Sequence, residues 1–177
     1  MIKDKEIAIR PADQNDAKIL WELIYRKEAP EWKRWDAPYF PHKALSFENF
    51  MTISEKFIAQ EDFWVITIDE IVCGIVSYYY EDAQKVWLEV GIVIHEGNNW
   101  NKGIGTRALK LWIDHLFNTL PLVRVGLTTW SGNERMIQVA EKLGMQLEAR
   151  IRKVRLFEEK YYDSIRMGVL REEWGDK

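Results

Sequence analysis

The chain has 177 residues, of which 47% are hydrophobic and 30% charged, with 10 Gly and 5 Pro. This composition excludes collagen-like, low-complexity and intrinsically disordered chains, and the length lets one domain bury a sizeable core. The formal net charge is -3, whereas a dedicated nucleic-acid binder usually carries a basic excess, so nucleic acid is not an expected partner. No linker or internal repeat is evident, and we expect residues 1–177 to form a single domain.

The only cysteine, Cys73, lies in the apolar run 71–76. A lone cysteine cannot form an internal disulfide, which favours a protein of a reducing compartment. Because the neighbours of Cys73 are apolar, we expect its thiol to be buried and inert. The N-terminal residues carry charges where a signal peptide needs an apolar core, and no apolar run approaches the roughly 18 residues of a membrane span. We therefore expect a cytoplasmic protein without membrane contact.

The first half of the chain changes from helical to strand periodicity. We expect a short strand over 7–10, a helix capped by Asp13, and a second helix from Ser46 to Ala59. Strands are then expected over 63–68, 71–80 and 86–94. The first two flank Asp69-Glu70, a pattern typical of a tight hairpin.

The second half alternates between helices and strands. Its expected elements are helices over 103–117 and 133–143, and strands over 123–129, 146–155 and 161–170. Early strands that look antiparallel, followed by a strand–helix–strand–helix–strand order, predict a mixed α/β (α+β) fold. We expect one central sheet of about seven strands with about four helices on its faces.

Aromatic residues make up 13% of the chain, and several gather in the segment 29–43, which is punctuated by Pro and lacks periodicity. They include Trp32, Trp35 and Tyr39. Two interpretations stay open, namely a hydrophobic flap packed on the body of the protein and an aromatic wall that lines a pocket.

A polar loop leads from the strand 86–94 to a helix that begins with Gly103 and Gly105. Glycines let the backbone approach a ligand, and the first amides of a helix bind anions such as a diphosphate. Lys102 and Arg107 add positive charge there. The loop lacks a Walker motif. Its glycines have the spacing of a dinucleotide fingerprint, but they do not follow the strand directly as that motif requires. The region 124–130 also lacks the carboxylate that would bind a ribose.

The segment 86–109 resembles motif A of the GNAT superfamily of acyl-CoA-dependent N-acyltransferases, whose loop reads Gln/Arg-x-x-Gly-x-Gly/Ala. Trp100-Asn-Lys-Gly103-Ile-Gly105 matches except at its first position, where Trp is similar to the branch of ribosomal-protein N-terminal acetyltransferases. Residues 133–145 resemble the second helix motif of the family, and 161–174 resemble the closing strand and tail of that branch. The resemblance therefore covers nearly the whole chain.

The resemblance implies acetyl-CoA (coenzyme A) as cosubstrate and no metal. In the family, a strand pairs with the pantetheine arm, loop amides bind the pyrophosphate, and an Asn reaches the arm. The residues at these positions are Ile92, Val93, Ile94, Trp100, Asn101, Lys102, Gly103, Ile104, Gly105, Thr106 and Asn133. Gly91 indicates a bulge or a close backbone approach in the strand, and in the family a bulge there opens the cleft.

The implied reaction is attack of a neutral primary amine on the acetyl thioester, so a base must take a proton from the ammonium form. Glu89, the only charged residue between Val86 and Ile94, is the candidate, acting directly or through water. A structural carboxylate is the alternative interpretation, and His95 is a weaker candidate base. Many family members have a Tyr that acts as the general acid, and this chain has Ala140 at that position. The branch often has a Ser where this chain has Met136, so no general acid is predicted.

For the acceptor we expect a cleft lined by Trp32, Trp35, Tyr39 and Trp130, together with Tyr161 or Tyr162. Glu31 and Asp36 are either acidic neighbours that attract a cationic amine or parts of a solvated charged loop. Within the family the acceptors are protein N-termini, polyamines and small amines. The sequence thus predicts an N-acetyltransferase that acts on a primary amine. The alternatives are a non-catalytic acyl-CoA-binding protein and a nucleotide-binding protein, and dimers in the branch leave a homodimer open.

Overall fold

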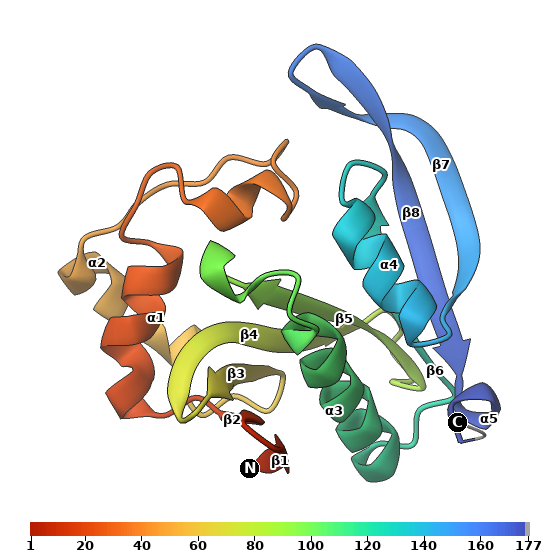
Figure 1. Cartoon of the computed structure of the whole chain (residues 1–177), viewed down its shortest axis with the longest axis horizontal. Coiled ribbons are helices and arrows are strands. Elements are labelled where there is room, and N and C mark those ends of the chain that lie inside the picture. Colours follow the sequence, from red (N-terminus) through yellow and green to blue (C-terminus); the bar gives the residue numbers. More distant parts are fainter. Residues whose placement is uncertain (176–177) are drawn as a thin grey trace.

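The computed structural model describes residues 1–175, and its strands form one sheet with the order β1-β2-β3-β4-β5-β6-β8-β7 (Figure 1). Neighbouring strands are antiparallel except β5 and β6, which are parallel. The strands are β1 (Ile2–Asp4), β2 (Ile7–Pro11), β3 (Phe63–Ile68), β4 (Ile71–Tyr80), β5 (Trp87–Ile94), β6 (Arg124–Trp130), β7 (Gln146–Phe157) and β8 (Lys160–Leu170). The prediction of one mixed sheet is confirmed.

Helices cover both faces of this sheet (Figure 1). They are α1 (Ala17–Ile24), α2 (Phe47–Met51), α3 (Ile104–Thr119), α4 (Glu134–Lys142) and α5 (Arg171–Trp174). The helix α3 is the crossover between β5 and β6, which a parallel pair requires because its strands start at the same end of the sheet. No helix among residues 1–175 has the length and apolar character to cross a membrane.

Two apolar clusters, one for each face, hold the layers together. The larger one contains Leu88 and Val90 of β5 with the stripe Ala108, Trp112 and Leu116 of α3, all of them buried. This is the stripe that the helical spacing of the sequence predicts. The smaller cluster includes buried residues of α1, α2 and the segment 29–43: Leu20, Phe50 and Trp32 among them. Alternate residues of one strand therefore serve different cores.

The expected helix from Ser46 to Ala59 is wrong in its length. The helix α2 ends at Met51, and a separate 3-10 turn covers Ser54–Lys56. Two β-branched residues, Thr52 and Ile53, follow α2, and the Ser54 hydroxyl donates a hydrogen bond to the Met51 carbonyl at 2.9 Å. Both features favour leaving the helix, because β-branched residues lose rotamer freedom there and a side-chain hydroxyl competes for backbone groups.

The sheet has eight strands and the described chain five α-helices, one more of each than expected. The additional strand β1 has three residues and the additional helix α5 has four, too few to show a hydrophobic period. The hairpin expected at Asp69-Glu70 is present, and both residues have positive φ, as a tight turn between twisted strands requires. Cys73 is buried, and burial raises the pKa of its thiol to about 12, so it stays an inert thiol.

His95 directly follows β5 and packs against the aromatic segment 29–43. Its imidazole is only 6% exposed and packs edge-on against Trp32, with ring centroids 5.3 Å apart. Burial lowers the pKa of His95 to about 4, because the charged imidazolium loses its hydration there. The ring is therefore neutral in the folded protein at pH 7, and it lies outside the cavity described below. The prediction of His95 as a candidate base is therefore wrong, because its ring does not line the cavity.

The buried His95 makes stability depend on pH. The pKa of His95 is near 6.5 in the unfolded chain and lower in the folded protein. As the pH falls from about 6.5 toward 4, the unfolded chain takes up a proton that the folded protein does not, so the free energy of unfolding decreases. Above about pH 6.5 His95 does not reduce it. Between pH 7.5 and pH 5 this one group should cost about 2 kcal/mol of unfolding free energy. Urea unfolding at both pH values should show that loss in the wild type and a smaller loss in His95→Phe. Equal losses in the two proteins would contradict this origin.

Candidate active site

The strands β5 and β6 pair over only three residues and then separate. The pairs are Trp87 with Arg124, Leu88 with Val125, and Glu89 with Gly126. Beyond Glu89, β5 continues to pair with β4 as far as Ile94, and β6 continues to pair with β8 as far as Trp130, so each strand stays with its other neighbour while the two separate. The separation leaves the inner edges of both strands free and creates an opening that starts next to Glu89.

Gly91 lies in this free part of β5 and is opposite Ser77 of β4. The β4–β5 pairing runs without a register shift, so the bulge expected at Gly91 is absent. The neighbour of Gly91 is a side chain and not a close backbone, because a Cβ atom on Gly91 would lie 2.9 Å from the Ser77 hydroxyl oxygen. The glycine therefore leaves this side of the opening without a side chain.

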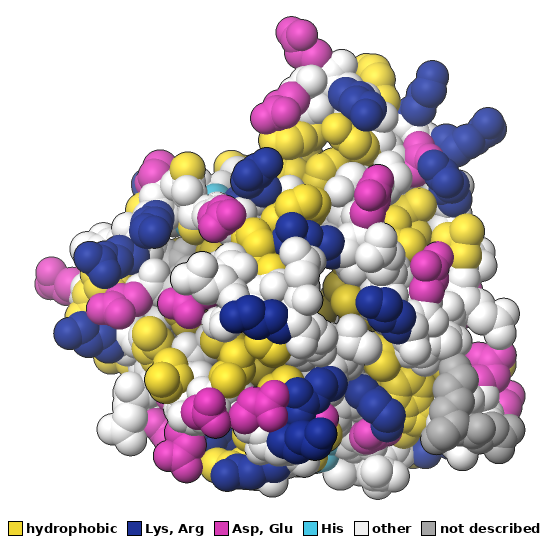
Figure 2. All heavy atoms as spheres, viewed as in Figure 1, with side chains coloured by type: hydrophobic (Ala, Val, Ile, Leu, Met, Phe, Trp, Pro, Cys, Tyr) yellow, Lys and Arg dark blue, Asp and Glu magenta, His cyan; other side chains and the backbone are white. Residues whose placement is uncertain are grey.

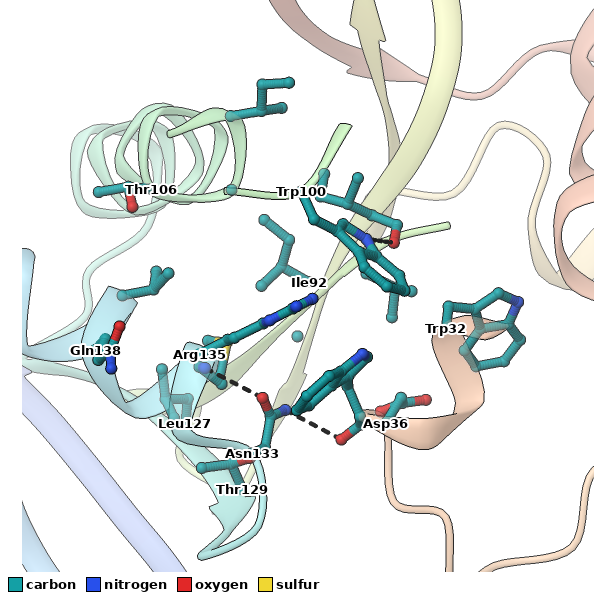
Figure 3. A pocket seen from close by; sticks show the side chains of 18 of the residues that line it. Trp32, Asp36, Ile92, Trp100, Thr106, Leu127, Thr129, Asn133, Arg135 and Gln138 are labelled. Atoms are coloured by element: carbon teal, nitrogen blue, oxygen red, sulfur yellow. Dashed lines mark hydrogen bonds between the residues drawn. The ribbon is translucent and has the colours of Figure 1, made fainter. Parts of the chain in front are cut away.

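The opening continues into a cavity of about 390 Å³ (Figure 3). Its walls come from the aromatic segment, β5, the loop before α3, the end of β6, and α4. Of the residues expected to bind a cofactor, ten line it: Ile92, Val93, Ile94, Trp100, Asn101, Gly103, Ile104, Gly105, Thr106 and Asn133. All four expected acceptor residues line it as well: Trp32, Trp35, Tyr39 and Trp130. Lys102 is exposed beside the cavity and is not part of its lining.

The loop before α3 has the shape that its glycines predict. Gly103 has φ 77°, a left-handed conformation that favours glycine, and it caps α3. A Cβ atom on Gly103 or Gly105 would meet no atom within 4 Å, so both glycines border open space. The first intrahelical hydrogen bond of α3 runs from the Arg107 amide to the Gly103 carbonyl, and the amides before it are free of helical partners. The cradle thus presents backbone donors at the positive end of a 16-residue helix.

The positive charges around the cavity differ from those expected. Arg107 points away from the loop, because its guanidinium forms ion pairs with Asp4 and Glu6, each at 2.6 Å. Two cations of α4, Arg135 and Lys142, line the cavity instead. On the face shown in Figure 2, Lys and Arg side chains surround the hollow between the aromatic segment, α3 and α4.

The aromatic segment is held across the cavity mouth by one backbone carbonyl. The Trp35 oxygen accepts hydrogen bonds from the Trp130 indole at 2.8 Å and from the Asn133 amide at 3.0 Å. Asn133 also caps α4, since its side-chain oxygen accepts from the Met136 amide. The Arg135 guanidinium lies over the rings of Trp35 and Trp100, at 4.2 and 4.9 Å from their centroids. Figure 3 shows Arg135 extending toward Trp100. The segment is therefore both a flap packed on the body and a wall of the pocket.

Two expected cofactor contacts are already used within the chain. The side-chain nitrogen of Asn133 bonds to the flap, and the Trp100 indole donates to the Ile94 carbonyl at 2.7 Å. Tyr162 lies against the Trp130 ring, with centroids 4.7 Å apart, whereas Tyr161 is 60% exposed outside the cavity.

Asp36 lines the cavity, but Glu31 lies outside its lining, near Gly97. Ala140 is fully buried in the core, and Met136 lines the cavity without a hydroxyl.

Glu89 is almost completely buried, with 1% of its surface exposed. One carboxylate oxygen, Oε2, accepts hydrogen bonds from the Tyr79 hydroxyl at 3.1 Å and the Thr128 hydroxyl at 2.5 Å. The other, Oε1, has no hydrogen-bond partner and lies 4.0 Å from Arg166 Nη1. Burial and the Glu89 carboxylate raise the pKa of Tyr79 above its usual value, so its hydroxyl keeps its proton. The site thus holds one buried carboxylate at the base of the opening.

Sequence reasoning missed Thr128, Arg135 and Lys142. The alternation of side chains along a strand would have indicated Thr128, because it lies two residues before Trp130, which was already assigned to the cleft, and residues two apart share a face. The helical period would have placed Arg135 and Lys142 on one face of α4, since they are seven residues apart, about two turns. No group of His, Cys, Asp and Glu side chains within residues 1–175 is arranged to hold a metal ion.

The comparisons with known proteins agree with this geometry. The acetyltransferase (GNAT) domain family matches residues 6–146 of the chain. Spermidine N(1)-acetyltransferase of Escherichia coli (strain K12) is 25% identical over 171 residues, which cover 95% of this chain and 88% of the relative. YdaF of Bacillus subtilis (strain 168), whose name describes a ribosomal N-acetyltransferase, is 30% identical over 110 residues, or 62% of this chain and 60% of that protein.

Among solved structures, spermidine N-acetyltransferase from Vibrio cholerae in complex with CoA and spermine has a TM-score of 0.78 with 17% identity. The alignment covers 97% of this chain and 99% of that chain, so the two share a fold. The resemblance read from the loop and the second helix is thereby confirmed. With a family match over most of its length, this chain belongs to the acetyltransferase (GNAT) family.

Proposed function

We propose that the protein transfers an acetyl group from acetyl-CoA to a primary amine, with Glu89 as the base. The observation that carries this proposal is the separation of β5 from β6 directly after the Glu89–Gly126 pair. It places a buried carboxylate at one end of the opening and the glycine cradle at the other. One elongated substrate in the opening would therefore have its anionic end on the cradle and its reactive end near Glu89.

The cradle fits the diphosphate of coenzyme A. Open space at Gly103 and Gly105 lets phosphate oxygens reach the free amides at the start of α3. Lys102 beside the cavity and Arg135 and Lys142 within it supply charge against the phosphates. Between the cradle and Glu89, the edge of β5 at 92–93 is not paired with β6 and offers backbone groups to the amides of the pantetheine arm, whereas the Ile94 carbonyl already accepts from the Trp100 indole. Acetyl-CoA, once bound, supplies the activated acetyl group.

Glu89 fits a general base better than a surface charge. An amine in water at pH 7 is mostly protonated and must lose a proton before its nitrogen can attack a thioester. The Glu89 carboxylate is buried, so bulk water does not compete for it, and its Oε2 atom is hydrogen-bonded to Thr128, which lines the cavity. Ala140 and Met136 have no hydroxyl that could act as the general acid. None is required, because a CoA thiol with an ordinary thiol pKa near 8.5 can leave as the thiolate.

The acceptor side of the cavity is aromatic. Trp32, Trp35, Tyr39 and Trp130 line it together with the carboxylate of Asp36. Aromatic faces and a carboxylate attract ammonium groups and alkyl chains, which supports a primary amine as acceptor. The spermidine acetyltransferases among the similar proteins act on such an amine, and a ribosomal acetyltransferase is among them too. Spermidine and a peptide with N-terminal alanine are therefore the first two acceptors to assay with acetyl-CoA.

Glu89→Gln keeps the size of the side chain and removes the base. We expect turnover of the better acceptor to fall about 100-fold or more at pH 7, with affinity for CoA within about threefold of the wild type. Steady-state kinetics and calorimetric titration with CoA measure the two quantities. Unchanged turnover would remove Glu89 from the mechanism. A wild type that binds CoA and acetylates neither amine would favour the non-catalytic acyl-CoA-binding alternative, which the missing hydroxyls at Ala140 and Met136 support.

Gly105→Val tests the cradle without straining the fold. Gly105 is the second residue of α3, its φ is not positive, and no atom lies within 4 Å of the added Cβ. The new side chain should occupy the phosphate position and lower CoA affinity at least about tenfold, while the melting temperature of the free protein stays near that of the wild type. Gly175→Ala, at a distant glycine with open surroundings, is the matched control. Wild-type CoA affinity in Gly105→Val would show that the phosphates bind elsewhere.

A further inference from the structure

A row of polar side chains crosses four neighbouring strands at the base of the opening. Tyr79 of β4 pairs with Glu89 of β5, and Thr128 of β6 pairs with Arg166 of β8. Gly126, two residues before Thr128, pairs with Glu89, so Glu89 and Thr128 project from the same face of the sheet. The row thus links the proposed base to a hydroxyl on the diverging strand.

Thr128 is the member of this row that reaches the cavity. Its side chain is exposed and lines the cavity, whereas Glu89 and Tyr79 are absent from the lining. Its hydroxyl donates to Glu89 Oε2 at 2.5 Å, so its proton already points at the carboxylate. A hydroxyl has one donor and two acceptor sites, which leaves its lone pairs for a second group. Among the described residues, Thr128 is the hydrogen-bonded link between Glu89 and the cavity.

The space in front of the Thr128 hydroxyl is open on the opposite strand. Two residues beyond the Glu89–Gly126 pair, β5 carries Gly91 and β6 carries Thr128. Gly91 has no side chain, and the strands are no longer paired there. An amine nitrogen can therefore approach between these two residues, within reach of Thr128, where it meets the hydroxyl before the carboxylate.

We propose that the Thr128 hydroxyl relays the proton of the acceptor to Glu89, an inference that rests on the proposed function of Glu89 as base. The ammonium N–H bond breaks as its proton bonds to Thr128 Oγ1, and the original Thr128 proton moves to Glu89 Oε2. The nitrogen keeps the electron pair and attacks the acetyl carbon. The C–S bond then breaks and its electrons leave with the CoA sulfur. The attacking nitrogen gives up its second proton, which the CoA thiolate takes up, so the products are the neutral amide and the CoA thiol. Thr128 ends the step as it began, and Glu89 has gained one proton.

Other charged groups near the row do not replace this path. Arg166 lies on the Oε1 side of Glu89 at 4.0 Å, and Tyr79 donates to Oε2 from β4 with Glu81 close to it. Further along the same face, Arg124 of β6 is paired with Glu148 of β7. None of these side chains lines the cavity, so none contacts an acceptor bound there.

Thr128→Val removes the hydroxyl and keeps the shape of the side chain. With acetyl-CoA and the better acceptor of spermidine and the alanine peptide, we expect kcat to fall about 100-fold at pH 7 and CoA affinity to stay within about threefold. Thr128→Ser keeps the hydroxyl and should stay within about fivefold of the wild type. Thr119→Val, the same change at the end of α3, is the matched control, and Thr128→Ala repeats the test if the valine variant does not fold.

The pH profile separates a relay from a structural role. As the pH rises toward the pKa of the amine, near 10 for an alkylamine such as spermidine and near 8 for a peptide N-terminus, a growing fraction of the acceptor arrives neutral. The deficit of Thr128→Val should therefore shrink at least about tenfold between pH 7 and pH 9.5. A deficit that is constant over this range would overturn the relay. So would a valine variant with wild-type turnover, or a serine variant as slow as the valine variant.

The outcomes for Thr128 and Glu89 differ between the two proposals. If Glu89→Gln is slow while Thr128→Val is normal, Glu89 remains the base and the relay is wrong. If Thr128→Val is slow while Glu89→Gln is normal, the proton does not end on Glu89, and both assignments fail although acetyl transfer stands. If the wild type acetylates neither amine, the function itself fails first.

Discussion

The separation of β5 from β6 after a single short run of pairing is the constraint on which the site depends. A parallel pair that continued would satisfy the backbone groups of residues 90–94 within the sheet and close the opening. Because β5 remains paired with β4 on its other side, the strand stays part of the sheet while one of its edges is free. The glycine cradle, the cavity and Glu89 are positioned relative to that free edge.

The flap connects the two halves of the site. Trp32 is anchored in the smaller core, its indole bonded to the Leu23 carbonyl and its ring packed on the neutral His95. Three residues further on, the Trp35 backbone is bonded to the end of β6 and the start of α4. The aromatic wall is thus fixed to Trp130 and Asn133, which also line the cavity, so the cavity is one continuous space.

Much of this arrangement could be predicted from the sequence, and the remainder depended on contacts between distant segments. Helical and strand periods gave the mixed sheet, and Gly103 with Gly105 gave the cradle, because those signals are local. The destination of Arg107 was not predictable, since Asp4 and Glu6 are about one hundred residues away and come close only after β1 pairs with β2. The partners of Glu89 were hidden for the same reason, as Tyr79 and Thr128 belong to other strands.

The flap is held at its centre by a main-chain oxygen and not by a side chain. Every amino acid carries that carbonyl, so the side chain at position 35 is free to change without loss of either hydrogen bond. Substitutions at position 35 can therefore change the shape and charge of this side of the cavity while the flap stays in place. The structure separates the part of the pocket that must be kept from the part that is available for new specificity.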